Sequence, residues 1–270
     1  MAGAVSARRM GSVEGEATFW QDAQTGWARE MVAKLIADKF GVMLSANSVG
    51  RLLAQLSITC EKPLHRAQER DAALVEQWLK KEHPKIKALA QVEKAEIFFG
   101  DAAHMRSHHH AGRTWGKKGE TPAVETTGAR HSLSLISAIS ARGQMRFMIM
   151  QAGGVIAAVF SEFLKRPLIG AKRAIFLVID RGPTHIARKT RAFVDSLNGR
   201  LRLFYLPPYS PDRNPDELVL KHLKADTVGR MATTSKADFN AKVRASTRQL
   251  QNDPDKIRSF YPKPSLRYAA

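Results

Sequence analysis

The chain has 270 residues, of which 44% are hydrophobic, so it can bury a core in one large domain or two small ones. Lysine and arginine number 43 against 25 aspartate and glutamate residues, and the net charge of +18 favours a polyanionic partner, most simply a nucleic acid. The single cysteine excludes an intrachain disulfide. No apolar run approaches the roughly 20 residues of a membrane span, which argues against a membrane partner. No signal peptide is recognisable, and the expected compartment is the cytoplasm.

The first part of the chain divides into a leader and a helical pair. Residues 1–26 show no hydrophobic period and are expected to form a disordered leader. Residues 27–61 have the pattern of two short helices, with Gly41 ending the first and Ser45 capping the second. The residues expected to face inward are Met31, Leu35, Ile36 and Phe40 in the first helix and Val49, Leu52, Leu53 and Leu56 in the second.

Two helices joined by a short turn have the shape of a helix-turn-helix unit. The second helix would then present Asn47, Ser48 and Arg51 outward as DNA contacts. A purely structural helical hairpin is the alternative, because many such hairpins never touch DNA. The excess of positive charge favours DNA binding.

A helical connector is expected over residues 62–93, after which the pattern changes. Its first residues are polar, a helix follows over residues 72–82, and Pro84 is expected to interrupt that helix before a shorter one.

Residues 94–252 alternate between strands and helices, which predicts a mixed α/β domain with helices against a central sheet. The run 174–179 is continuously apolar, as is typical of a strand buried on both faces. Residues 253–270 are expected to form a basic tail. The expected strands are 95–100, 132–140, 144–151, 174–179 and 201–206, and the expected helices are 155–165, 187–198, 217–228 and 237–251.

Three carboxylates stand at comparable places in this pattern. Asp101 and Asp180 are each expected directly after a strand, and Glu217 follows a third strand through a proline-rich loop. Asn214 is a good N-cap and Pro215 suits the first position of a helix, so Glu217 could serve only in a capping box. Ligands of α/β sheets gather at strand ends, however, and carboxylates there suit Mg²⁺. The sequence alone leaves both interpretations open.

Four blocks carry a resemblance to a known family. They are FFGDAAHMRS, RTWGKKGETP, FLVIDRGPTH and LPPYSPDRNPDELVLKHLK, and the last is the most specific. They resemble bacterial insertion-sequence transposases of the Tc-mariner type. These belong to the DDE transposase and retroviral-integrase superfamily, which has a ribonuclease H-like fold.

The resemblance implies a metal-dependent DNA transposase that cuts at transposon ends and joins them to target DNA. It implies that Asp101, Asp180 and Glu217 are catalytic and bind two Mg²⁺ ions, which Mn²⁺ could replace. Asp216 falls on a position that the family leaves variable and is expected to face away from the site. The implied partners are double-stranded DNA, with target sites containing TA, and a second copy of the chain in a homodimer acting on the bacterial nucleoid.

Further residues are expected to assist. His185 matches a histidine of the family block and is expected to orient a water molecule or a phosphate, or else to make a structural hydrogen bond. A polar loop is the preferred interpretation of the histidines near Asp101, with a transition-metal site as its alternative. The residues expected to contact DNA from the catalytic domain are Arg113, Lys117, Lys118, Lys221 and Lys224.

The sequence also departs from the family pattern. Many relatives carry Glu where Ala102 stands, Asn where Arg181 stands and Trp where Leu220 stands. Relatives tend to have two helix-turn-helix units, and only the second, winged-helix-like one is evident, so the chain is expected to be shortened or frame-shifted at its start. An inactive remnant that only binds DNA is therefore the alternative function, and a structure-specific nuclease is a third.

Overall fold

The computed structural model describes residues 28–60, 69–107, 118, 123, 129–150 and 154–270. The chain divides into two compact units, Met1–Arg66 and Ala67–Ala270. Among the described helices, none is long and apolar enough to cross a membrane.

The first unit contains two packed helices, α3 (Arg29–Phe40) and α4 (Ala46–Gln55). Gly41 follows α3 with a φ of 65°, a left-handed conformation that glycine adopts without strain. The side chain of Ser45 accepts a hydrogen bond from the Ser48 amide at 3.1 Å and caps α4 as expected.

The inward face of α3 differs from the expected one. Val32 and Ile36 are buried against Val49 of α4, whereas Met31 and Phe40 are 41% and 54% exposed. The apolar residues of α3 fit more than one stripe, and only packing against α4 decides which stripe is buried.

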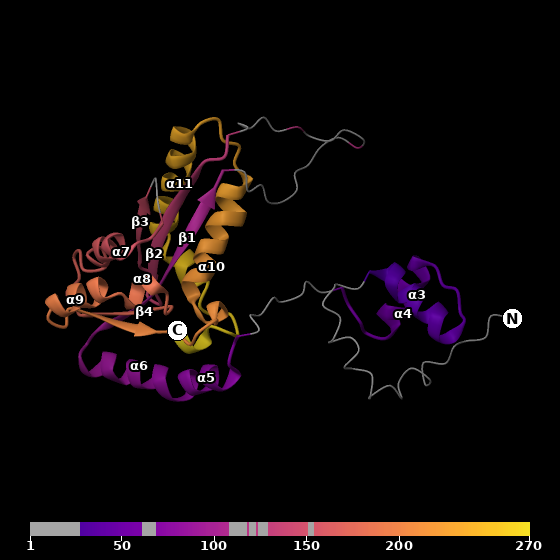
Figure 1. Ribbon diagram of the computed structural model, residues 1–270, viewed down its shortest axis with the longest axis horizontal. Helices are drawn as coiled ribbons and strands as arrows, with labels where there is room; N and C mark the ends of the chain where they lie inside the picture. Colours follow the sequence, from indigo (N-terminus) through magenta and orange to yellow (C-terminus); the bar gives the residue numbers. More distant parts are fainter. Residues whose placement is uncertain (1–27, 61–68, 108–117, 119–122, 124–128, 151–153) are drawn as a thin grey trace. The chain divides into compact units, whose positions relative to one another are not determined.

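The second unit is built on a five-stranded sheet in the order β3-β2-β1-β4-β5 (Figure 1). Strands β1 and β2 are antiparallel, as are β2 and β3, whereas β4 is parallel to both β1 and β5. The expected mixed sheet is therefore confirmed. The strands are β1 (Glu96–Arg106), β2 (Ser132–Ser140), β3 (Met145–Met150), β4 (Ile175–Ile179) and β5 (Leu201–Tyr205).

Strand β1 is longer than expected, because it continues past Gly100 and Asp101 to Arg106. Glycine and aspartate are poor strand residues, which is why the sequence suggested an end there. The antiparallel register with β2, from Phe98 opposite Ser140 to Arg106 opposite Ser132, keeps the chain extended. Asp101 therefore lies within a strand and not at its end.

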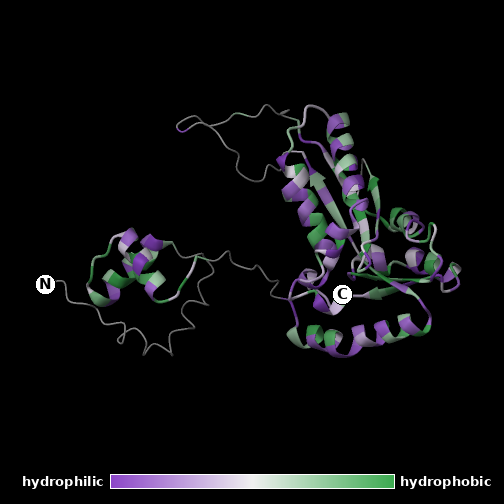
Figure 2. Cartoon of the chain, turned by 180° about the vertical axis from the view of Figure 1, so that it is seen from behind, coloured by the Kyte–Doolittle hydropathy of each residue, from purple (hydrophilic) through white to green (hydrophobic). Residues whose placement is uncertain are grey.

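Helices cover both faces of the sheet (Figure 1). One face packs against α7 (Ala157–Leu164) and α9 (Arg188–Ser196). The short helix α8 (Pro183–Ile186) directly precedes α9 in the chain. The other face packs against α10 (Pro215–Lys221) and α11 (Lys236–Gln251). Figure 2 shows both hydrophobic and hydrophilic residues along α10 and α11, as expected of helices with one buried side.

The expected interruption at Pro84 does not occur. Helix α5 (Ala72–Gln77) continues through a π-helical turn, Trp78–Glu82, into α6 (His83–Val92). Pro84 occupies the first turn of α6, and the wider π-helical turn before it accommodates the missing amide donor. Trp78 and Ile86 on this segment are buried in the second unit.

The last residues, expected to form a basic tail, are packed onto the second unit. Helix α12 (Pro254–Arg258) follows α11, and the apolar side chains of this segment enter the core that α10 and α11 cover. The buried apolar residues are Ile257, Phe260, Tyr261, Leu266 and Ala269.

Candidate active site

Asp101 and Asp180 lie at the same level of two neighbouring parallel strands. Strand β1 pairs with β4 as far as Phe99 opposite Val178. Two further residues along this register bring Asp101 level with Asp180, which directly follows β4. Because parallel neighbours lie about 5 Å apart, the two aspartates come close although 78 residues separate them.

The pleat of β1 directs Asp101 toward α10. Phe98 belongs to the core on the α7 side, whereas Phe99 and Ala103 belong to the core on the α10 side. Alternate residues of a strand share a face, so Asp101 faces α10 with Phe99 and Ala103. The carboxyl groups of Asp101 and Glu217 share a hydrogen bond. Glu217 therefore lies next to Asp101, whereas its expected orientation toward Asp180 as well stays a prediction.

Asn214 fixes the start of α10 next to this pair. Its Oδ1 accepts a hydrogen bond from the Asp216 amide at 3.1 Å, and its Nδ2 donates to the carbonyl of Gly100 at 3.0 Å. The amide of Asn214 donates to the carbonyl of Pro211 at 2.9 Å. That amide is thus satisfied within the proline loop, and Glu217 is left free to meet Asp101.

Asp216 does not face away from the site as expected. It is fully buried, and its Oδ2 accepts a hydrogen bond from Ser137 Oγ at 2.7 Å. Ser137 is the residue of β2 directly opposite Asp101. The short helix α10 therefore turns two adjacent carboxylates inward, one toward β1 and one toward β2. Ser137 gives a sequence signal in retrospect, as a polar residue among the inward-facing Leu133, Leu135 and Ile139.

Burial and the neighbouring carboxylates raise the pKa values of Asp101 and Asp216. Burial, the hydrogen bond with Glu217 and the charge of Asp216 raise the pKa of Asp101 well above its ordinary value. Burial is also the main cause that raises the pKa of Asp216 to about 8, although the hydrogen bond from Ser137 opposes it. Buried carboxyl groups placed next to other carboxylates favour a bound positive charge.

Asp180 has a different environment. Its Oδ1 accepts hydrogen bonds from the Gly182 amide at 2.9 Å and from His185 Nδ1 at 2.5 Å. The hydrogen bond from His185 is the main cause that lowers the pKa of Asp180. His185 is buried and lies 4.4 Å from the ring of Phe160, measured between ring centroids. Asp180 is therefore held ionised, and no described residue donates a hydrogen bond to its Oδ2.

Asp101 and Asp180 open into one cavity of about 430 Å³. Its other walls are the residues after β4, from Arg181 to Pro183, and the proline loop, from Leu206 to Pro211. The prolines fix the backbone of this loop, so the wall opposite the aspartates is rigid. The cavity is wide enough for a substrate group to reach both carboxylates.

These residues fit divalent cations in part. Asp101 and Glu217 form a pair of hard oxygen ligands that could hold one cation between them. Mg²⁺ usually needs only one or two carboxylates, with water and substrate phosphate as the remaining ligands. In the described part of the chain, no three His, Cys, Asp or Glu side chains are grouped closely enough to hold one ion. The histidines 108–110 lie outside the described residues.

The expected DNA-contact residues of the first unit lie along α4. Asn47 and Arg51 are exposed and Ser48 is half-buried. A guanidinium nitrogen of Arg51 lies 3.4 Å from Ser48 Oγ. One face of α4 thus carries a polar row while Val49 is buried on the other.

The expected DNA-contact residues of the second unit are spread over several segments. Lys118 and Lys221 are exposed. Lys224 is half-buried within the π-helical turn His222–Thr227, so it does not continue the α-helical face of Glu217 and Lys221. Arg113 and Lys117 lie outside the described residues.

Two family descriptions match the sequence. The family described as DDE superfamily endonuclease matches residues 96–238, which include all the carboxylates of the site. The family described as winged helix-turn-helix matches residues 23–82. The site therefore lies within the first match, and α3 and α4 within the second. Among curated proteins, no sequence matches the chain.

Solved structures of the Mos1 mariner transposase share the fold. The Mos1 strand transfer complex has a TM-score of 0.61 at 18% identity, over 94% of this chain and 75% of that chain. The pre-cleavage Mos1 transpososome has a TM-score of 0.59 at 16% identity, over 96% of this chain and 78% of that chain. The Mos1 mariner paired end complex with Mn has a TM-score of 0.58 at 14% identity, over 95% of this chain and 79% of that chain. The ribonuclease H-like expectation is thereby confirmed.

Proposed function

Because the chain belongs to the DDE superfamily of endonucleases, we propose that it is a DNA transposase that cuts at the ends of a mobile DNA element and joins them to target DNA. The observation that carries this proposal is the hydrogen-bonded pair of Asp101 and Glu217 in reach of the cavity that Asp180 also lines. The fold shared with Mos1 strand transfer and paired end complexes supports it.

Each acidic residue has a distinct role in this proposal. Asp101 and Glu217 together hold one divalent cation, and Asp180, kept ionised by His185, binds a second through its free Oδ2. Bound Mg²⁺ or Mn²⁺ would stabilise the charge on the attacking and leaving oxygens of the phosphodiester. The rigid proline loop keeps the strand in line between the carboxylates.

The basic charge and the helix-turn-helix unit supply the DNA contacts. Asn47, Ser48 and Arg51 are proposed to read duplex ends from α4, and Lys118 and Lys221 to hold backbone phosphates. The two ends of an element have to be brought together, as in the Mos1 paired end complexes, so we propose that the chain acts as a homodimer. We also propose TA-containing targets in the bacterial nucleoid, as the motif blocks of the sequence imply.

The test uses short duplexes copied from both ends of the DNA element that encodes the chain, with Mg²⁺ or Mn²⁺. The wild-type chain is expected to cut them, and Asp180→Asn is expected to lose cutting. Asp195→Asn is the matched control, because Asp195 is an exposed carboxylate of α9 outside the cavity. If Asp180→Asn cuts as well as the wild type, the assignment is wrong. Binding without cutting by the wild type would identify the DNA-binding remnant instead.

A further inference from the structure

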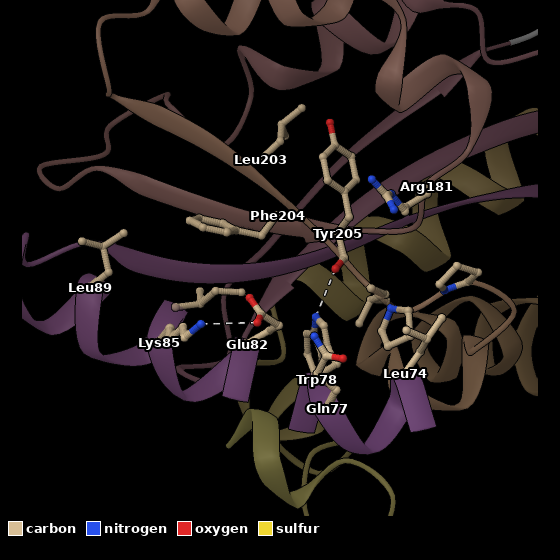
Figure 3. A pocket seen from close by; sticks show the side chains of 14 residues that line it. Leu74, Gln77, Trp78, Glu82, Lys85, Leu89, Arg181, Leu203, Phe204 and Tyr205 are labelled. Carbon is tan, nitrogen blue, oxygen red and sulfur yellow. Dashed lines mark hydrogen bonds and ion pairs between the residues drawn. The ribbon is translucent and has the colours of Figure 1, made fainter. Parts of the chain in front are cut away.

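A pocket beside the catalytic cavity shares one charged residue with it. This pocket, of about 470 Å³, lies between the helical segment α5–α6 and strand β5 (Figure 3). It shares Arg181 and residues 206–208 with the catalytic cavity. Among the described residues that form this shared wall, Arg181 alone is charged. Its guanidinium is therefore the positive charge placed at the border of the proposed active site.

Arg181 rests on a fixed aromatic ring. Its guanidinium carbon lies 5.7 Å from the centroid of the Tyr205 ring, and Figure 3 shows the two side chains next to each other. Tyr205 is held at both ends: its hydroxyl donates to the carbonyl of His185 at 3.3 Å, and its own carbonyl accepts from Trp78 Nε1 at 3.0 Å. An arginine placed on a fixed ring loses less conformational freedom when it binds a ligand.

The described part of the chain does not use the donors of Arg181. Within the described ranges, its guanidinium makes no hydrogen bond and no ion pair, and the side chain is exposed. The neighbouring carboxylate of Asp180 accepts from Gly182 and His185 instead. A planar guanidinium with free donors matches the oxygens of a phosphate.

We propose that Arg181 binds a backbone phosphate of the DNA strand that enters the catalytic cavity. The proposal rests on the proposed function, since it takes the substrate of the same site to be DNA. Arg181 would hold the strand at the wall shared by the two cavities, so that the next phosphate along the strand reaches Asp101 and Asp180. Its role is to bind and position substrate.

The experiment removes single charges from both partners. Duplexes copied from the element's end carry one neutral methylphosphonate at each position in turn, and binding to the full chain is measured by fluorescence anisotropy in metal-free buffer. The variants are Arg181→Gln and, as a matched control, Arg202→Gln. Arg202 also lies over an aromatic ring, 5.6 Å from the centroid of Phe176, but it pairs with Glu93 at 3.0 Å and lies outside the catalytic cavity.

Neutralising the one phosphate that Arg181 binds is expected to weaken wild-type binding about tenfold, because a hydrogen bond to a charged group contributes on that order. Arg181→Gln should bind the unmodified duplex about tenfold more weakly and should show no further loss at that phosphate. Arg202→Gln should behave like the wild type. Equal thermal melting of Arg181→Gln and the wild type would show that the variant is folded.

If Arg181→Gln remains as sensitive as the wild type to every neutral phosphate, the proposal for Arg181 is overturned while the proposed function stands. A wild-type chain that binds but never cuts overturns the proposed function, and the phosphate scan still decides the role of Arg181. A wild-type chain that does not bind the duplex overturns both.

Discussion

The hydroxyl of Ser137 donates a 2.7 Å hydrogen bond to the carboxylate of Asp216, so the residue just before Glu217 is anchored to the middle of the sheet. Ser137 stands opposite Asp101 in the β1–β2 register. The strand that carries Asp101 and the helix that carries Glu217 are thus joined through β2 as well as through their own hydrogen bond. This buried contact holds the first turn of α10, which also carries Glu217.

Replacing Ser137 by alanine is expected to lower the free energy of unfolding by about 1–3 kcal/mol, because it leaves the buried Asp216 carboxyl group without that partner. Urea unfolding measures the loss. Ser259→Ala is the control, since the Ser259 hydroxyl donates a hydrogen bond of the same length at an exposed site. Equal stability of the two variants would contradict the structural role of Ser137.

Asp216→Asn is expected to change how stability depends on pH. Burial raises the pKa of Asp216 to about 8 in the folded chain, against an ordinary value of 3.8. The folded state therefore binds a proton that the unfolded state releases, and this group lowers stability as the pH rises from about 4 to about 8. In metal-free buffer, the free energy of unfolding of Asp216→Asn relative to the wild type should therefore be higher at pH 8 than at pH 5. Urea unfolding at both values checks this, and a gain independent of pH would speak against it.

Glu217→Gln and Asp216→Asn are expected to separate the two adjacent carboxylates by activity. Glu217 is the proposed metal ligand, so Glu217→Gln should slow duplex cutting by at least about a hundredfold. Asp216 is hydrogen-bonded to Ser137 and packed away from solvent, and asparagine can still accept from that hydroxyl. Asp216→Asn should therefore keep most of the cutting rate. Single-turnover kinetics measure both, and the reverse order would exchange the two assignments.

His185→Leu is expected to narrow the pH range of cutting. The hydrogen bond from His185 lowers the pKa of Asp180, so the wild-type carboxylate stays ionised to lower pH. Without it, Asp180 takes up a proton at higher pH, and the acid limb of the rate profile should move upward. His104→Gln serves as the control, because His104 contacts Ser134 outside the cavity. An unmoved acid limb would leave His185 with a structural role only.

Trp78 is expected to stabilise the packing of the α5–α6 segment against the sheet. Trp78→Phe loses the 3.0 Å hydrogen bond to the Tyr205 carbonyl and should cost about 1 kcal/mol of unfolding free energy. Trp78→Ala also removes a buried ring and should cost about 3–5 kcal/mol. Leu74 lies on the same segment but is 44% exposed, so Leu74→Ala should lower the free energy of unfolding by less than either Trp78 variant. Urea unfolding ranks the three, and an equal cost for all would mean that this segment is only loosely attached.

Much of the second unit could be predicted from the sequence. Continuous apolar runs and alternation predict strands whatever their partners, so β2, β3, β4 and β5 were expected within one or two residues. The end of β1 could not be predicted. Gly100 and Asp101 are poor strand residues, and the ladder with β2 outweighs that preference.

The candidate site divides in the same way. Residue types, spacing and the motif blocks single out Asp101, Asp180 and Glu217, and Asn214 was expected as the cap of α10. The inward turn of Asp216 was not expected, because a helix of seven residues can direct its first turn in several ways until it packs. Its partner Ser137 lies 79 residues earlier in the chain.

The sequence by itself determined which carboxylates are available, which segments carry them and that the chain as a whole is strongly basic. These properties depend on local preferences and on composition. The tertiary structure alone decided that Asp101 meets Glu217, that Asp216 accepts a hydrogen bond from Ser137 and that the guanidinium of Arg181 lies over the Tyr205 ring. Each of these depends on the register of neighbouring strands and on the packing of a helix onto a sheet, which bring together residues that no local pattern connects.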